Sequence, residues 1–230
     1  MMDHNNALDF STVIASSVHD MKNSLSMLLN TLDDIVSQCD PSVCQSVAQF
    51  SQLQYEGQRV NNHLIQLLTI YKIGNSQYSA NINEQDVEDF LQECAMQYEA
   101  LLSPKGIAIE VECKTGLMAF IDRELVSGVI NNVVNNAYRY SKDKIVLGGS
   151  EQDGFVVISV SDNGRGYPES MLMDSSSGVS GVNFSSGSTG LGLYFSSLVA
   201  ATHKTKERNG FIKCSNDGLD GGGRFSIYIP

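Results

Sequence analysis

In residues 131–141, NNVVNNAYRYS, two asparagines lie four positions apart, so Asn132 and Asn136 share one face of a predicted helix. Two carboxamides that face the same way can hold a metal ion and its waters through neutral oxygens. An asparagine-rich helix face is more often an ordinary polar surface, because amides also make surface hydrogen bonds. The meaning of this segment therefore depends on the segments that follow it.

The segment SVSDNGRGYP, residues 159–168, places Asp162 directly after a predicted strand. A carboxylate at that point can accept a hydrogen bond from an exocyclic amine, and Gly164 and Gly166 let the backbone come close to a flat ring or a phosphate. The same residues also fit a tight Asp-Asn-Gly turn with no ligand. From this segment alone the two interpretations are equally good.

A third segment, GSTGLGLYF at residues 187–195, places Gly187, Gly190 and Gly192 at the start of a predicted helix. The N-terminal N–H groups and the dipole of a helix favour an anion. A solitary Gly-x-Gly is weak evidence for such a site. The three segments together, in this order along the chain, are a specific signal.

In order and spacing, the three segments resemble the N, G1 and G2 boxes of the ATPase fold that histidine kinases share with gyrase, Hsp90 and MutL. The resemblance runs from about Val87 to Pro230 and includes Asp122 just ahead of the N-box helix. It implies that the chain binds ATP and Mg²⁺. The residues that it assigns are Asn132 and Asn136 to Mg²⁺ and phosphates, Arg139 to a phosphate, Tyr140 to the adenine face, Asp162 to the adenine amine, Gly164 and Gly166 to the flanks of the base, and Gly190, Leu191 and Gly192 to the phosphates.

One residue of the N box separates two branches of this family. The ATP-hydrolysing branch, similar to gyrase and Hsp90, has a glutamate base at the place of Asn132. An amide cannot take a proton from water, so transfer of the phosphoryl group to another acceptor is favoured over hydrolysis. The Ser/Gly-rich residues 174–189 correspond to a mobile lid. Only Phe184 is available there for the aromatic box of the family.

Composition excludes several other functions. The formal net charge is −11, and clustered Lys and Arg are absent, which argues against nucleic-acid binding. An acidic ATP-binding protein would need a metal ion to offset charge repulsion. No apolar run approaches the roughly 18 residues of a membrane span, and the N-terminus lacks the pattern of a signal peptide. The five cysteines form no CxxC pair, so reduced thiols in the cytoplasm are expected.

Ahead of the ATPase-like region, heptad spacing predicts two long helices. Apolar residues recur at alternating intervals of three and four from Ile14 to Ile35 and again from Phe50 to Tyr71. The sequence Cys39-Asp40-Pro41-Ser42 separates them. A lone antiparallel hairpin cannot cover both of its apolar seams, so two copies are expected to pair as a homodimeric four-helix bundle.

The first of these helices carries VHDMKNSL at residues 18–25, which resembles the H box of a histidine kinase dimerisation domain. Val18 belongs to the apolar seam, so His19 should lie beside it, exposed to solvent. Such a histidine is usually an ordinary surface residue, but a fitting ATP domain makes it the expected phospho-acceptor. Asp20 is the expected general base, holding the second ring N–H. Asn23, one turn further on, implies a reverse phosphatase activity by the resemblance; otherwise it is a solvated polar residue.

Two residues depart from the family pattern or lie outside it. Ser24 stands where the family often has a proline, so any bend of the helix there should be weaker. His63, in the second helix, lacks an acidic neighbour and is interpreted as structural.

Together these patterns predict an all-α helical hairpin, forming a dimeric four-helix bundle, followed by an α+β sandwich ATP-binding domain with helices on one face of a mixed sheet. The predicted domains are residues 1–72 for the hairpin, 73–83 for a linker and 84–230 for the ATP-binding domain. In the last, helices are expected at 87–102, 125–140 and 191–202, and strands at 107–113, 144–148, 155–161, 210–215 and 224–229.

The predicted function is that of a cytoplasmic histidine protein kinase. It would phosphorylate His19 from Mg-ATP and pass the phosphoryl group to an aspartate in the receiver domain of a response regulator, with input from a separate sensor protein. One alternative is a histidine phosphotransfer or adaptor protein that no longer binds ATP, against which the intact Asp162 and box glycines argue. The other is a serine kinase of the anti-sigma type, against which the heptad hairpin argues.

Overall fold

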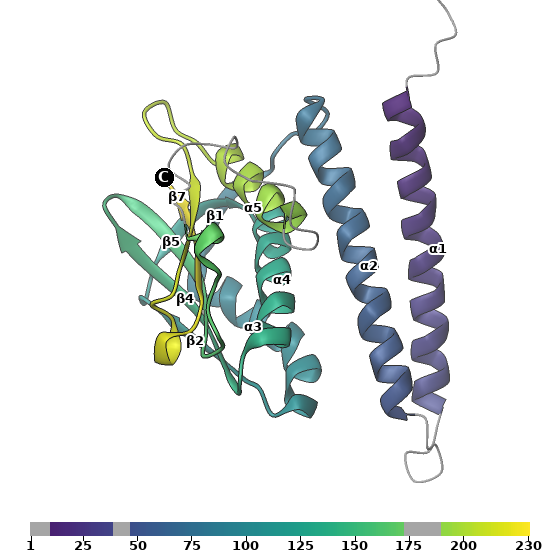
Figure 1. Ribbon diagram of the computed structural model, residues 1–230. Coiled ribbons are helices and arrows are strands. Elements are labelled where there is room, and N and C mark those ends of the chain that lie inside the picture. The colour runs from purple at the N-terminus through teal and green to yellow at the C-terminus, as the bar shows by residue number, and fades with distance from the viewer. Residues whose placement is uncertain (1–9, 39–46, 173–189) are drawn as a thin grey trace, which may run out of the picture. The chain divides into compact units, whose positions relative to one another are not determined.

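The computed structural model describes residues 10–38, 47–172 and 190–230, and the chain divides into two units, Met1–Ser79 and Ala80–Pro230 (Figure 1). The predicted turn at 39–42 lies outside the described residues, as does the whole of the expected lid, 174–189, with Phe184 and Gly187. Within the described residues, no helix combines the length and the apolar content that crossing a membrane requires.

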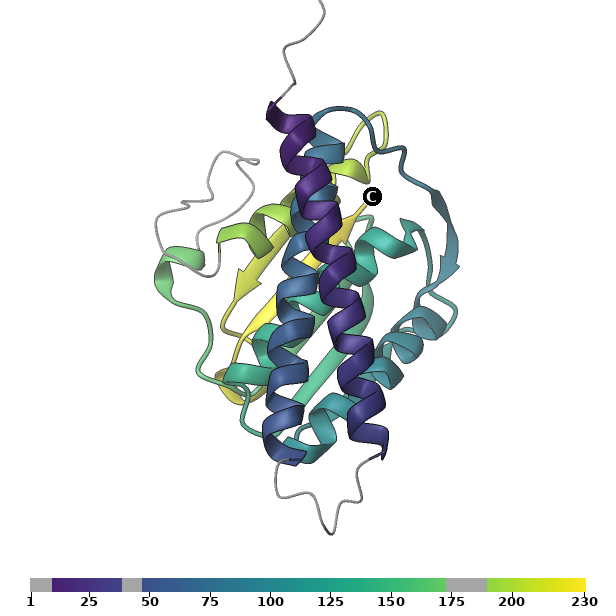
Figure 2. The same cartoon turned by 90° about the vertical axis from the view of Figure 1, so that its right-hand side faces the viewer.

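The first unit is a hairpin of two long helices, α1 (Phe10–Gln38) and α2 (Val47–Gly74). Figures 1 and 2 show the two helices side by side. Leu29 is buried where they pack, and Gly57 lets α2 come close, because a β-carbon at Gly57 would lie 2.7 Å from Leu29 Cδ2. Both helices extend slightly beyond the ranges that the heptad pattern predicts. The pairing of two such hairpins into a bundle remains a prediction.

The second unit contains a five-stranded sheet in the order β2-β4-β5-β7-β6. β2 and β4 are parallel and the other neighbours are antiparallel, which makes the sheet mixed, as predicted. Its strands are β2 (Ala108–Cys113), β4 (Lys144–Gln152), β5 (Phe155–Asp162), β6 (Phe211–Ser215) and β7 (Arg224–Ile229).

Three helices cover one face of this sheet, as Figures 1 and 2 show. They are α3 (Val87–Leu102), α4 (Arg123–Tyr140) and α5 (Gly190–Thr202), and short 3₁₀ helices follow at η1 (Ser103–Lys105), η2 (Glu169–Met171) and η5 (Leu219–Gly221). Ile158 and Ile227, paired across β5 and β7, are each 1% exposed on this face. Alternating strand residues thus form the core with the helices, and each such side chain contributes about 1.5–3 kcal/mol by its burial.

Two strands of the second unit are not predicted by the sequence pattern. β1 (Ile82–Asp86) pairs antiparallel with β3 (Met118–Asp122), with Ile82 opposite Asp122. β1 begins inside the range expected to be a linker. Its sequence, INEQD, has no alternation of apolar and polar residues, so only its pairing with a strand far along the chain identifies it as a strand.

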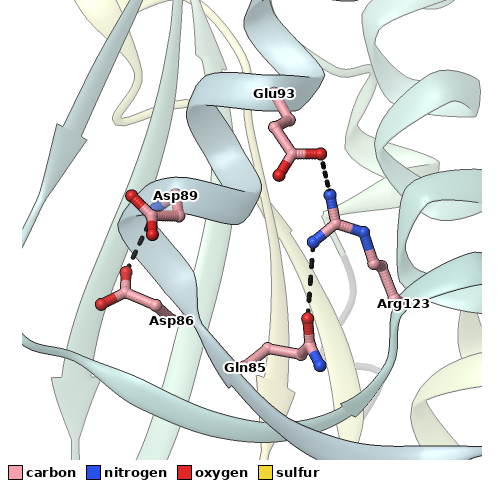
Figure 3. A network of polar contacts seen from close by, with 5 residues as sticks. All are labelled: Gln85, Asp86, Asp89, Glu93 and Arg123. Carbon is pink, nitrogen blue, oxygen red and sulfur yellow. Dashed lines mark hydrogen bonds and ion pairs between the residues drawn. The ribbon is translucent and has the colours of Figure 1, made fainter.

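Arg123, the first residue of α4, joins this strand pair to two helices (Figure 3). Its guanidinium forms an ion pair with Glu93 of α3, and its Nη1 donates to Gln85 Oε1 of β1 over 3.4 Å. The guanidinium also lies 5.2 Å from the ring centroid of Phe90. Since the Glu93 side chain is about half exposed, the ion pair itself contributes little to stability. The contacts of Arg123 connect β1, α3 and α4.

Candidate ATP-binding and phospho-acceptor sites

α4 presents two of the predicted site residues on one face. Asp122 caps its N-terminus, with Oδ1 accepting from Leu125 N over 3.1 Å. The opposite face carries the buried residues Leu125, Val126, Val129, Ile130, Val133 and Val134. This apolar stripe fixes the rotation of the helix and leaves Asn132 and Asn136 half-buried, one turn apart. Arg139 is exposed on the last turn.

The start of α5 lies against Asn132. A β-carbon at Gly192 would be 2.4 Å from Asn132 Oδ1, so only glycine fits at this position without displacing the amide. Gly190 begins the helix and Leu191, beside it, is half-buried. Ser196 Oγ donates to Gly192 O over 2.8 Å within the first turns. The structure thus brings together the predicted N and G2 segments, which lie about sixty residues apart in the sequence.

Asp162 ends β5 and is held by its own turn. Its N–H donates to Gly223 O over 2.9 Å, and its Oδ1 accepts from Gly164 N over 2.7 Å. Burial raises the pKa of the Asp162 carboxyl, while hydrogen bonds from the backbone of Gly164 and Gly223 act in the opposite direction. The carboxylate is half-buried and oriented, as an acceptor for an exocyclic amine should be.

Tyr140, at the end of α4, lies beside the same turn. A β-carbon at Gly164 would be 2.3 Å from Tyr140 O, so the turn approaches the end of the helix closely. The guanidinium of Arg165 lies 4.5 Å from the centroid of the Tyr140 ring, a cation–π contact. Gly166 has a φ of +75°, which favours glycine. The predicted adenine-end residues therefore gather at one place.

Asn163 is a site residue that the sequence pattern did not single out. Its Oδ1 accepts from three successive backbone N–H groups, those of Lys142, Asp143 and Lys144, over 3.2–3.3 Å. Its Nδ2 donates to Asp143 Oδ1 over 2.6 Å. Asn163 is 7% exposed. It ties the turn that carries Asp162 to the connection that leaves α4.

The loop between β6 and β7 packs against the segment that follows β5, a contact that the sequence pattern does not predict. Asn216 Oδ1 accepts from Tyr167 N over 2.6 Å, and its Nδ2 donates to Tyr167 O over 2.9 Å. A β-carbon at Gly222 would be 2.2 Å from Asp162 O. The glycine run 221–223, directly before the last strand, is the sequence signal for this close approach.

The residues present fit a Mg-nucleotide. Asn132 and Asn136 offer amide oxygens, which are ligands that Mg²⁺ accepts together with phosphates and water. The start of α5 offers backbone N–H groups for an anion. Among the described residues, no group of three or more His, Cys, Asp or Glu side chains lies close enough to hold a metal ion.

The predicted phospho-acceptor lies on α1 in the first unit. Val18 is 8% exposed, whereas the His19 side chain is 59% exposed beside it. His19 Nδ1 lies 3.3 Å from Asn23 Nδ2 and 3.6 Å from Asp20 Oδ1. Both neighbours thus approach the same ring nitrogen. His63 is exposed on α2.

Residues 121–230 match the family model for the histidine kinase-, DNA gyrase B- and HSP90-like ATPase. The adaptive-response sensory kinase SasA of Synechocystis is 30% identical over 169 residues, which cover 69% of this chain and 44% of SasA. The sensor histidine kinase TmoS of Ectopseudomonas mendocina is 22% identical over 96% of this chain and 23% of TmoS. The chain thus spans less than half of either relative.

Solved structures share the fold. The histidine kinase AdeS of Acinetobacter baumannii has a TM-score of 0.60 at 20% identity, covering 92% of this chain and 96% of that one. The catalytic domain of the histidine kinase ThkA has a TM-score of 0.53 at 22% identity, covering 65% of this chain and 95% of that one. These structures share the fold alone. The family match over residues 121–230 and the similarity to SasA show that the second unit contains a histidine kinase-type ATPase domain of the family that includes DNA gyrase B and HSP90.

Proposed function

We propose that the chain is a cytoplasmic histidine protein kinase, which phosphorylates His19 from ATP and passes the phosphoryl group to an aspartate of a response-regulator receiver domain. The observation that carries the proposal is the contact between Gly192 and Asn132. It joins the anion-binding end of α5 to an amide where hydrolysing relatives would need a carboxylate base, so phosphates can be held there without a group that activates water.

The nucleotide would lie between two clusters of the second unit. At the adenine end, the Asp162 carboxylate would accept from the adenine amine beside the Tyr140 ring. At the phosphate end, Arg139 and the backbone of Gly190, Leu191 and Gly192 would neutralise and orient the phosphates. Bound Mg²⁺, held by Asn132 and Asn136, would offset phosphate charge in a chain whose own net charge is −11.

The tautomer of His19 decides whether its Nδ1 forms a hydrogen bond with Asp20 or with Asn23. When Nδ1 carries the proton, the Asp20 carboxylate can accept it, and Nε2 holds the lone pair needed for attack. When Nε2 carries the proton, Nδ1 accepts from the Asn23 amide and Nε2 is no longer a nucleophile. Asp20 therefore favours the tautomer that can be phosphorylated, and Asn23 favours the other.

The proposed reaction moves the γ-phosphoryl group of ATP first to His19 and then to the receiver. The Nε2 lone pair forms a bond to the γ-phosphorus of ATP while the bond from that phosphorus to the bridging oxygen breaks, and ADP leaves with those electrons. The imidazole ring becomes positive, and the Asp20 carboxylate offsets this charge until the Nδ1 proton is lost. A carboxylate oxygen of the receiver aspartate then attacks the phosphorus, and the N–P bond breaks with its electrons returning to Nε2. Nδ1 takes back a proton, which restores the neutral ring.

Partners complete the proposal. The hairpin leaves large apolar side chains exposed, namely Met21, Met27, Leu28, Leu53, Val60, Ile65 and Leu67. A second copy of the hairpin would cover them in a homodimeric bundle. A separate sensor protein is expected to supply the input. With the receiver bound, Asn23 would orient a water against its phospho-aspartate, which gives the phosphatase activity.

The test is incubation of the chain with γ-³²P-labelled ATP and Mg²⁺. Acid-labile label is expected on the parent chain and on His63→Ala, whose histidine is exposed on the other helix of the hairpin. The label should be lost in His19→Ala. Full labelling of His19→Ala would overturn the proposal, as would label that resists acid.

A further inference from the structure

A buried histidine, His203, follows the last residue of α5 and is 1% exposed. Its Nδ1 lies 2.8 Å from Val199 O, and its Nε2 accepts from Asp122 N over 2.9 Å. A carbonyl oxygen can only accept, so Nδ1 carries the proton and the ring is neutral. Burial lowers the pKa of His203, in agreement with a neutral ring.

Asp122 connects this histidine to two other elements. It caps α4 through Leu125 N, and its second carboxylate oxygen, Oδ2, accepts from Asn81 N over 2.8 Å. Asn81 is the second residue of the second unit, directly before β1. A single buried residue pair, Asp122 and His203, therefore fixes the beginning of β1, the start of α4 and the end of α5.

Three contacts between α4 and α5, or between the residues that flank them, occur in opposite order along the two helices. Asp122 meets His203, Gly128 faces the ring of Phe195, and Asn132 meets Gly192. The first and last contacts are separated by ten residues on the α4 side and eleven on the α5 side, or about 15–17 Å at 1.5 Å per residue. The segments Asp122–Asn132 and Gly192–His203 are thus nearly equal in length. The His203 contact lies at one end of this helix pair, and the contact of Asn132 with Gly192 lies at the other.

We propose that His203 is a positioning residue of the nucleotide site: by holding Asp122 against the end of α5, it sets the spacing of Asn132 and Gly192 at the far end of the helix pair. The proposal rests on the function proposed for that site. Because packed helices move as rigid elements, loss of the hydrogen bond between Asp122 and His203 at one end lets α4 and α5 shift relative to each other at the other end. Asn81 connects the same point to the segment that leads back to α2.

Three substitutions separate positioning from general stability. His203→Gln retains an acceptor for Asp122 N, and His203→Leu removes both hydrogen bonds. His203→Asn retains a donor for Val199 O but is too short to reach Asp122, so it removes only the hydrogen bond from Asp122 N. If the leucine variant does not fold, the asparagine variant still tests whether this hydrogen bond positions the nucleotide site. The control is Val157→Ala in β5, which truncates a buried apolar side chain on the sheet face opposite to that of Ile158, away from the helices.

Two measurements on the full chain are needed. The first is hydrogen exchange without nucleotide, in which residues 190–196 and Asn81 should exchange faster in His203→Leu and His203→Asn than in the parent or in Val157→Ala. The second is titration with a fluorescent ATP analogue and Mg²⁺ below the melting temperature of each variant. Affinity should fall about tenfold in the leucine and asparagine variants, the expected effect of one buried hydrogen bond, and less than about threefold in His203→Gln.

Equal exchange and equal affinity in His203→Leu, His203→Asn and Val157→Ala would overturn the positioning role. If the parent chain binds no nucleotide, the proposed function fails, and the exchange rates of residues 190–196 still decide whether His203 holds the start of α5.

Discussion

His19 and His203 are bound by similar contacts in opposite surroundings. Each has one ring nitrogen close to a group four residues away on its own helix, Asn23 for His19 and Val199 O for His203. The His19 side chain is 59% exposed, whereas His203 is 1% exposed. Water can replace the contacts of the first but not those of the second. The exposed ring is therefore available for chemistry, and the buried ring serves to hold structure.

The comparison predicts that changes around His19 affect activity without affecting stability. Asp20→Asn should lower the rate of autophosphorylation by about a hundredfold, because the amide cannot offset the positive ring. The melting temperature and the affinity for ATP should stay those of the parent, since Asp20 is exposed. Initial rates of labelling, with Asp33→Asn on the same helix as control, measure the effect. An unchanged rate would remove Asp20 from the mechanism.

Changes at the half-buried Asp162 should affect binding first. Asp162→Ala removes the acceptor for the adenine amine, and affinity for an ATP analogue should fall by about ten- to a hundredfold, the range for a hydrogen bond to a charged group. Asp217→Ala, an exposed carboxylate paired with Arg224, is the matched control. Equal affinity in the two variants would place the nucleotide elsewhere.

Substitution of Asn163 should lower the stability of the fold more than the rate of the reaction. Asn163→Ala leaves three backbone N–H groups without their acceptor, and the free energy of unfolding should fall by about 2 kcal/mol. Urea unfolding followed by circular dichroism measures this change. The exposed Asn23→Ala should stay within about 0.5 kcal/mol of the parent. A comparable loss in both variants would contradict the distinction between the two regions.

The smallest expected effect is a pH dependence that comes from His203. Its folded pKa is lowered by burial, with the Asp122 carboxylate as the charged neighbour acting in the opposite direction. Below about pH 6.5 the unfolded chain binds more protons than the folded chain, so stability should fall as the pH drops from there toward the folded pKa. His203→Gln lacks this contribution. Unfolding midpoints at several pH values should therefore decline less in the variant, and parallel curves would contradict the assignment.

Local patterns predicted most of the elements. The predicted strand 224–229 coincides with β7, and heptad spacing found both long helices. β1 and β3 were missed because INEQD and MAFID are short and are stabilised by pairing across about forty residues, as between Ile82 and Asp122. Pairing over that distance leaves no local periodicity.

The candidate site shows the same division. The boxes were recognisable because their glycines and amides recur at fixed spacing, and the structure brings Asn132 to Gly192 and Tyr140 to Gly164. Asn163 and His203 were missed because their roles depend on partners about 20 and 81 residues away. A lone histidine after an apolar helix carries no sequence signal for such a contact.

In the proposed function, the nucleotide site of the second unit supplies the phosphoryl group to His19. Phosphopeptide mapping under neutral conditions, after incubation with Mg-ATP, tests it most directly, with Asp162→Ala as the control for nucleotide binding. Phosphate is predicted on His19 in the parent chain and not in Asp162→Ala. Phosphate on another residue of the parent, or on His19 at the same level in both chains, would contradict the claim.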